Sequence, residues 1–304
     1  MGLDHGHAGT AAQHYRRRMA VVLGIIGLIT LVQVAGSLLS GSLALLADAG
    51  HGLTDGLGVG LALLATVAAA RPPSDHRTFG LQRLEILAAL VNGLFVSVVA
   101  AFILVGGVRR LLDPVPIEAG LMLGAAAVGL LGNATALLIL RRGKRESLNV
   151  RGAYLEVFGD TVSSVAVIAA AAVILATGFL RADGIASIAI GLLILPRAWM
   201  LLRDVVHVLL EATPQHVDLA DVRRHILEAP AVVGVHDLHA WTITSGVPVV
   251  SAHVVVDDAQ LAEHGHGAIL DRLHHCLAGH FDIEHSTFQI EPQGHADHEY
   301  ARHE

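Results

Sequence analysis

The chain has 304 residues, of which 53% are hydrophobic and only 15% are charged. Soluble domains are about a quarter charged, so this composition, with a mean hydropathy of +0.60, indicates a membrane protein. The formal net charge of −7 gives no basis for a nucleic-acid partner, and the single cysteine, Cys276, excludes an intrachain disulfide framework or a cysteine-based zinc site.

Six apolar stretches are long enough to cross a bilayer core, which needs about 20 residues of helix. They cover residues 19–39, 43–69, 84–108, 117–140, 153–175 and 184–202. We therefore expect an all-α bundle of six transmembrane helices over residues 19–209. A His-bearing cytoplasmic tail is expected before it, over residues 1–18.

Lysine and arginine are unevenly shared between the ends of these spans. One side carries Arg16, Arg17, Arg18, Arg71, Arg77, Arg83, Arg141, Arg142, Lys144, Arg145 and Arg151, and the other carries Arg109, Arg110 and Arg181. Basic residues gather on the cytoplasmic side of membrane proteins. We expect a multi-pass protein of the cell membrane, embedded in the lipid bilayer, with both termini in the cytoplasm.

After residue 209 charged residues become common, and no further stretch of membrane length follows. Helical spacing over residues 218–227 and 261–277 alternates with strand-like runs over residues 232–244, 247–257 and 284–291. The order α-β-β-α-β predicts a small α+β cytoplasmic domain over residues 210–292. A His-bearing flexible tail is expected over residues 293–304.

Two pairs of ionisable residues interrupt the apolar helices: His51 with Asp55, and Glu156 with Asp160. Residues four apart lie on one face of a helix, so each pair can point at one ligand. Charges in hydrocarbon are costly unless they are paired, protonated or metal-bound. One imidazole and three carboxylates suit a four-coordinate divalent cation such as zinc, manganese, cobalt or ferrous iron. The alternatives are hydrogen bonds between helices and a proton relay.

Other polar residues in or near the spans have two readings each. Asp48, one turn before His51, either belongs to an access path or lies at the outer interface. Arg83 and Glu85 begin the third span and form either an ion pair between helices or an interfacial pair that reaches toward water. Three lone amides are expected to make hydrogen bonds between helices: Gln33, Asn92 and Asn133.

Four segments together resemble the cation diffusion facilitator family. Residues 46–55 (LADAGHGLTD) resemble its second-helix motif, and residues 151–160 (RGAYLEVFGD) resemble its fifth-helix motif. Residues 78–85 (TFGLQRLE) are similar to the start of its third helix, and residues 235–241 (VHDLHAW) to its cytoplasmic domain. The resemblance implies a homodimeric secondary transporter that exchanges a cytoplasmic divalent cation for protons.

The resemblance also implies a ferredoxin-like C-terminal domain that dimerises and binds metal. It points to His236, His253, His285 and Glu291 as cytoplasmic ligands, and to a structural role for Arg83 and Glu85. Zinc-transporting members commonly have His at the position of Glu156. An oxygen ligand there shifts preference toward harder cations.

We expect efflux of Zn²⁺ driven by inward proton flux, with zinc also a regulatory ion in the cytoplasmic domain. Manganese, cobalt, cadmium or iron as the main substrate is the alternative, and a non-transporting membrane metal sensor is a second one. No P-loop is present, so no nucleotide is expected. The lack of an HExxH motif, and of a Ser or Cys nucleophile paired with His in a span, argues against an enzyme.

Overall fold

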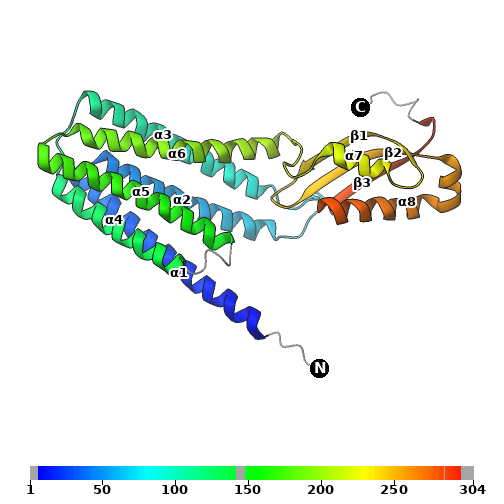
Figure 1. The fold of residues 1–304 in the computed structure, drawn as a ribbon, viewed down its shortest axis with the longest axis horizontal. Coiled ribbons are helices and arrows are strands. Elements are labelled where there is room, and N and C mark those ends of the chain that lie inside the picture. The colour runs from blue at the N-terminus through cyan, green and yellow to red at the C-terminus, as the bar shows by residue number, and fades with distance from the viewer. Residues whose placement is uncertain (1–5, 142–147, 284, 296–304) are drawn as a thin grey trace. The chain divides into compact units, whose positions relative to one another are not determined.

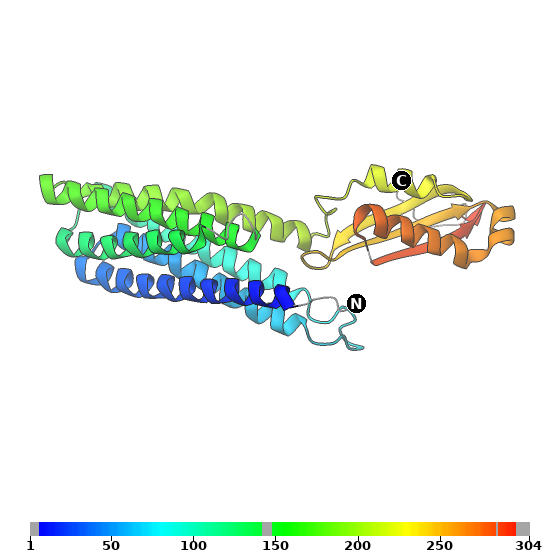
Figure 2. The same ribbon diagram turned by 60° about the horizontal axis from the view of Figure 1, so that its bottom comes forward.

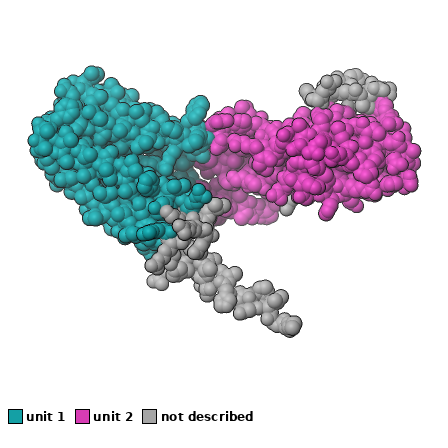
Figure 3. All heavy atoms as spheres, viewed as in Figure 1, with its two compact units in different colours: residues 1–61, 91–201 teal, residues 62–90, 202–304 magenta. Residues whose placement is uncertain are grey.

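The computed structural model describes residues 6–141, 148–283 and 285–295, with side chains described from residue 21 and again from residue 151. It contains two compact units, residues 1–61 with 91–201, and residues 62–90 with 202–304 (Figure 3). The basic loop residues 142–147, residues 1–5 of the expected N-terminal tail and residues 296–304 of the expected C-terminal tail lie outside the described residues.

Six long helices run side by side as a bundle (Figures 1 and 2). They are α1 (Gly6–Ser40), α2 (Leu43–Ala69), α3 (Leu84–Leu112), α4 (Ala119–Leu140), α5 (Leu148–Thr177) and α6 (Arg181–Leu209). All six are long and apolar enough to cross a membrane, judged by length and composition. The prediction of a six-helix membrane region is confirmed.

The helices extend beyond the apolar stretches that predicted them. α1 begins at Gly6, inside the segment expected as a tail, and α6 reaches Leu209. Hydrophobicity marks the part of a helix that lipid can cover, whereas backbone hydrogen bonding continues into polar residues. The sequence therefore predicted where the spans lie, but it underestimated the length of the helices.

Small residues dominate the core of the first unit. Its buried residues from α2 to α6 include Ala44, Ala100, Ala126 and Ala171, each with no exposed area. A Cβ atom added at Gly184 would lie 2.9 Å from the carbonyl oxygen of Gly107, so the backbones of α3 and α6 nearly touch. Such close approach provides the van der Waals contact that holds membrane helices together.

The second unit contains a three-stranded sheet and two further helices. In chain order these are α7 (Leu219–Leu227), β1 (Val232–Thr242), β2 (Pro248–Val256), α8 (Asp258–Phe281) and β3 (His285–Pro292). The sheet order is β1-β2-β3, with β1 antiparallel and β3 parallel to β2. Parallel neighbours need a crossover, which α8 supplies. The predicted α+β domain is confirmed.

The two faces of this sheet differ. Val250, Ala252 and Val254 of β2 are buried in one cluster with residues of α7 and α8. Because side chains alternate along a strand, Ser251 and His253 lie on the other face. In β1 the register shifts between His236 and His239, with Asp237 between them in a left-handed conformation (φ 45°).

Candidate metal centres

Three of the four predicted membrane-site residues converge. His51 and Asp55 lie one turn apart on α2, and Asp160 lies on α5. Nδ1 of His51 is 3.7 Å from an oxygen of Asp55, and Nε2 is 3.6 Å from an oxygen of Asp160. One ligand atom from each residue lies within 4.8 Å of the others. The imidazole thus stands between two carboxylates contributed by different helices.

Two atoms of this cluster lack hydrogen-bond partners among the described residues: Nδ1 of His51 and Oδ2 of Asp55. His51 is only 6% exposed. A buried polar atom without a partner costs about 1–3 kcal/mol, and native structures contain few of them. A metal ion bound at this cluster would supply a partner for Oδ2 of Asp55.

The fourth predicted residue, Glu156, lies one turn before Asp160 on α5 and is partly buried. It is not a member of the three-residue group of ligand atoms. Its charge acts on Asp55 and His51, which places it within electrostatic reach of that group. The structure therefore separates three converging residues from one that stands beside them.

Sequence reasoning missed Arg197, which lies on α6 directly after Pro196. Its Nη1 atom is 3.2 Å from Nε2 of His51. The signal was available, because Arg197 is an ionisable residue inside the apolar stretch 184–202 and such residues are functional by default. The loop-charge count considered only residues at the ends of the spans.

Asp48 is 5% exposed and belongs to a hydrogen-bonded network between helices. It accepts hydrogen bonds from Nε2 of Gln33 (2.6 Å) and from Oγ of Ser164 (2.9 Å). Asn133 donates to the same Ser164 hydroxyl over 3.5 Å. The expected bonds of Gln33 and Asn133 are confirmed, whereas Oδ1 of Asn92 has no partner in the described chain. Asp48 is thus buried between helices, and its two expected roles, in an access path or at the outer interface, stay predictions.

Sequence reasoning also missed Asp183, a buried acid whose carboxylate is fully hydrogen-bonded. One of its oxygens accepts from Oγ of Ser42 (2.5 Å) and from the N–H of Ala44 (3.1 Å). The other accepts from the N–H of Leu43 (3.0 Å) and from Nη1 of Arg110 (2.7 Å). Both oxygens are therefore used to cap the first turn of α2, and Asp183 is not a candidate ligand.

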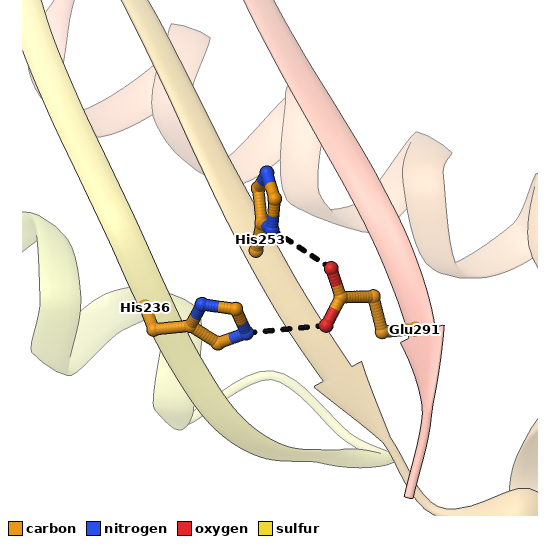
Figure 4. Close-up of side chains that lie close together, drawn as sticks. All are labelled: His236, His253 and Glu291. Carbon is orange, nitrogen blue, oxygen red and sulfur yellow. Dashed lines mark hydrogen bonds and ion pairs between the residues drawn. The ribbon is translucent and has the colours of Figure 1, made fainter. Parts of the chain in front are cut away.

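A second cluster lies on the face of the sheet opposite the helices. The carboxylate of Glu291, on β3, reaches toward both His236 of β1 and His253 of β2 (Figure 4). Its Oε2 is 3.1 Å from Nε2 of His236, and its Oε1 is 2.8 Å from Nδ1 of His253. The two imidazole rings have centroids 5.0 Å apart. These three residues also offer ligand atoms within 4.8 Å of one another.

Two neighbours orient this cluster. Gln289 donates a hydrogen bond to Glu291 over 2.8 Å, and Asp237 is 3.3 Å from Nδ1 of His236. Burial alone would raise the pKa of Glu291, but the hydrogen bonds from His236 and Gln289 and the nearby imidazoles outweigh it and leave the pKa below its ordinary value. A carboxylate that stays ionised, beside oriented imidazoles, is the arrangement that metal sites use.

The remaining predicted residues lie elsewhere. His285 is exposed at the start of β3, paired with Val249, and is not a member of this cluster. Nη2 of Arg83 is 2.8 Å from an oxygen of Glu211, and Glu85 accepts a 2.5 Å hydrogen bond from Thr244. Arg83 and Glu85 thus each bind another segment of the second unit.

Two family models match the chain. The model of the cation efflux transmembrane domain matches residues 19–210. The model of the cytoplasmic domain of cation efflux proteins matches residues 214–293. Together they cover both parts of the chain that the fold separates.

Whole-length relatives are also found among known proteins. The chain is 42% identical over 297 residues to zinc transporter ZitB of Escherichia coli (strain K12), covering 96% of this chain and 93% of the relative. It is 42% identical over 291 residues to metal cation efflux system protein CzcD of Cupriavidus metallidurans, covering 96% and 90%. A cadmium, cobalt and zinc/H(+)-K(+) antiporter of Bacillus subtilis is 37% identical over 267 residues, covering 87% and 85%.

Solved structures that match the chain include one of a C-terminal domain. It is the metal-bound C-terminal domain of the CzcD transporter of Cupriavidus metallidurans, with 45% sequence identity and a TM-score of 0.23. The match covers 25% of this chain and 99% of that chain.

Proposed function

The chain belongs to the cation diffusion facilitator family of metal efflux transporters, and from this premise we propose that it exports Zn²⁺ from the cytoplasm in exchange for protons. The observation that carries the proposal is the convergence of His51, Asp55 and Asp160. One nitrogen and two oxygens make a ligand set that suits zinc. Glu156 provides a third carboxylate beside them.

Exchange follows from the chemistry of these side chains. Carboxylate oxygens and imidazole nitrogen bind either protons or a metal ion, so the two cargoes compete for the same atoms. A site that opens alternately to each side of the membrane then carries metal one way and protons the other. The name of the Bacillus subtilis relative, a cadmium, cobalt and zinc/H(+)-K(+) antiporter, supports this coupling.

Zinc is our first choice of substrate because zinc appears in the names of two of the relatives above. Glu156 favours a second candidate, a harder divalent cation such as manganese, because hard cations prefer oxygen ligands. Cobalt and cadmium are named for the Bacillus subtilis relative. Competition of zinc transport by manganese, cobalt and cadmium separates these substrates.

The cluster of His236, His253 and Glu291 supports a second, regulatory metal site in the cytoplasmic domain. We further propose that two copies associate through this domain, because the family model that it matches is that of a dimerisation domain. The basic loops support an orientation with the C-terminal domain in the cytoplasm.

Transport by proteoliposomes tests the proposal. Purified protein should move Zn²⁺ when a proton gradient is imposed, and zinc entry should drive a measurable counterflow of protons. Asp160→Ala should reduce zinc flux to the background of empty vesicles, because it removes the only converging ligand contributed by α5 among the described residues.

Asp113→Ala is the matched control, since Asp113 is an exposed acid between α3 and α4. It should transport at the parent rate. Zinc movement without proton counterflow would refute the exchange mechanism. Normal transport by Asp160→Ala would refute the assignment of the site.

A further inference from the structure

A permanent positive charge stands inside the proposed transport site. Arg197 lies on α6 within an apolar stretch, and its Nη1 atom is 3.2 Å from Nε2 of His51. That nitrogen is also the one nearest Asp160, at 3.6 Å. An arginine in a membrane helix is costly, so its contact with the ligand cluster calls for a physical reason.

α5 leaves space for this guanidinium. Gly159 directly precedes Asp160, and a Cβ atom added there would lie 3.3 Å from Nη2 of Arg197. The charge of Arg197 acts on Asp55, Glu156 and Asp160 together. No other lysine or arginine forms a hydrogen bond with His51 or these acids in the described part of the chain. Arg197 is exposed overall, which leaves its side chain room to withdraw when a metal ion takes the nitrogen.

The net charge of the site indicates a role for Arg197. Three ionised carboxylates and a neutral imidazole carry three negative charges, one more than a divalent cation neutralises. Uncompensated charge is expensive where the dielectric constant is low. The guanidinium, which stays protonated in proteins, supplies the missing positive charge. With Arg197 included, the loaded site is neutral.

We propose that Arg197 is a tethered cation that sets the net charge of the transport site to match a divalent ion and limits how tightly the metal is held. This inference rests on the proposed function, because it assumes that the four residues bind the cargo. It makes Arg197 a positioning residue that acts through His51 and the carboxylates. Metal affinity should then follow the net charge of the site.

A double-mutant cycle at Glu156 and Arg197 tests whether Zn²⁺ affinity follows the net charge of the site. Zn²⁺ affinity is measured by titration calorimetry on the full chain in detergent, in a His236→Ala/His253→Ala background that removes the cytoplasmic cluster. Arg197→Gln should tighten binding by about tenfold, and Glu156→Gln should weaken it by about tenfold. The Glu156→Gln/Arg197→Gln double variant restores the charge balance and should return close to the affinity of the background protein.

A conservative variant separates charge from structure. Arg197→Lys keeps the charge and should bind Zn²⁺ within about twofold of the background protein, whereas a structural guanidinium would not be replaced by lysine. Arg203→Gln removes an exposed arginine six residues further along α6 and should leave the affinity unchanged. In proteoliposomes Arg197→Gln should lower both KM and the maximal rate, because zinc is then released more slowly.

The results distinguish failure of the role of Arg197 from failure of the proposed function. Unchanged or weaker Zn²⁺ binding in Arg197→Gln, or a double variant weaker than both single variants, would overturn the inference. Asp160→Ala is measured in parallel: if it still binds and transports zinc, the proposed function fails. If Asp160→Ala abolishes binding while the Arg197 variants do not follow site charge, only the role of Arg197 fails.

Discussion

A single buried carboxylate organises the cytoplasmic cluster. Glu291 is 1% exposed, yet it contacts the imidazoles of His236 and His253 and the amide of Gln289. Breaking hydrogen bonds to a charged group costs about 1.5–3 kcal/mol. Glu291 therefore stabilises the sheet through these contacts.

This stabilisation should depend on pH in a defined direction. The pKa of Glu291 lies below its ordinary value of 4.5, so the folded protein favours the ionised form. The contribution is complete above the ordinary pKa and is lost as the pH falls through the lowered one. With a chelator present, Glu291→Gln should destabilise the domain by about 2 kcal/mol near neutral pH, and the difference should vanish in acid.

Tryptophan fluorescence measures this difference in the full chain. The sequence has two tryptophans, so Trp199→Phe leaves Trp241 of β1 as the reporter of the sheet. Glu263→Gln, an exposed acid on α8, is the control and should melt as the parent does at every pH. A Glu291→Gln deficit that grew in acid would contradict the lowered pKa.

The sequence predicted these residues unevenly. His51, Asp55 and Asp160 were predicted from helical spacing, because residues four apart must share a face. Glu156 and His285 carried the right chemistry but stand outside the two groups of ligand atoms. Spacing along one helix or strand cannot give the distance to another element. That distance determines that Glu156 and His285 lie outside the two groups. The same limit hid the contact between Arg197 and His51.

At the scale of elements, the first turn of α2 depends on a side chain from α6. Asp183 is fully buried and accepts hydrogen bonds from Ser42, Leu43, Ala44 and Arg110. Asp183→Asn removes the charge and leaves the guanidinium of Arg110 without its ion pair. Loss of one partner of a buried pair costs about 3–5 kcal/mol. The thermal midpoint of the protein in detergent, followed by size-exclusion chromatography, should fall by many degrees.

Two comparisons make this result specific. Asp113→Asn changes an exposed acid just after α3 and should leave the midpoint unchanged. Arg110→Leu in the Asp183→Asn background removes the orphaned charge and should recover part of the loss. An Asp183→Asn protein as stable as the parent would show that the cap is dispensable.

The contact between α3 and α6 depends on two glycines. A Cβ atom at Gly184 would lie 2.9 Å from the backbone oxygen of Gly107, and a backbone atom cannot move aside as a side chain can. Gly184→Ala should therefore lower stability by about 1–3 kcal/mol, the usual cost of overpacking. Gly124→Ala on α4, where no atom lies within 4 Å in the described chain, should be neutral or slightly stabilising. Comparison of their thermal midpoints tests the contact, and equal midpoints would contradict it.

For the whole molecule, the order of elements was readable because each class has its own pattern. Apolar stretches of membrane length gave the six helices, and alternating strands with a crossover helix gave the sheet. What could not be read was which faces meet. The alanine-rich membrane core and the placement of His236, His253 and Glu291 on one sheet face depend on packing between elements distant in sequence.

The expected orientation of the protein in the membrane predicts from which side Cys276 can be labelled. The basic loops predict that the C-terminal domain lies in the cytoplasm, and that domain holds the only cysteine of the sequence, Cys276. Burial, and then the charge of Glu228, raises the pKa of this thiol, so labelling needs a mildly alkaline buffer. A membrane-impermeant maleimide should label Cys276 in inside-out vesicles and leave it unlabelled in right-side-out vesicles.

A cysteine on the opposite side completes the experiment. Asp113→Cys in a Cys276→Ser background places the thiol in the exposed loop between α3 and α4. This variant should show the reverse pattern, with labelling in right-side-out vesicles, because one membrane crossing by α3 separates its loop from the cytoplasm. Zinc transport by the variant confirms that it is folded. If Cys276 reacted in right-side-out vesicles and the thiol at position 113 reacted in inside-out vesicles, the orientation inferred from the loop charges would be wrong. The proposed direction of zinc transport would then be reversed as well.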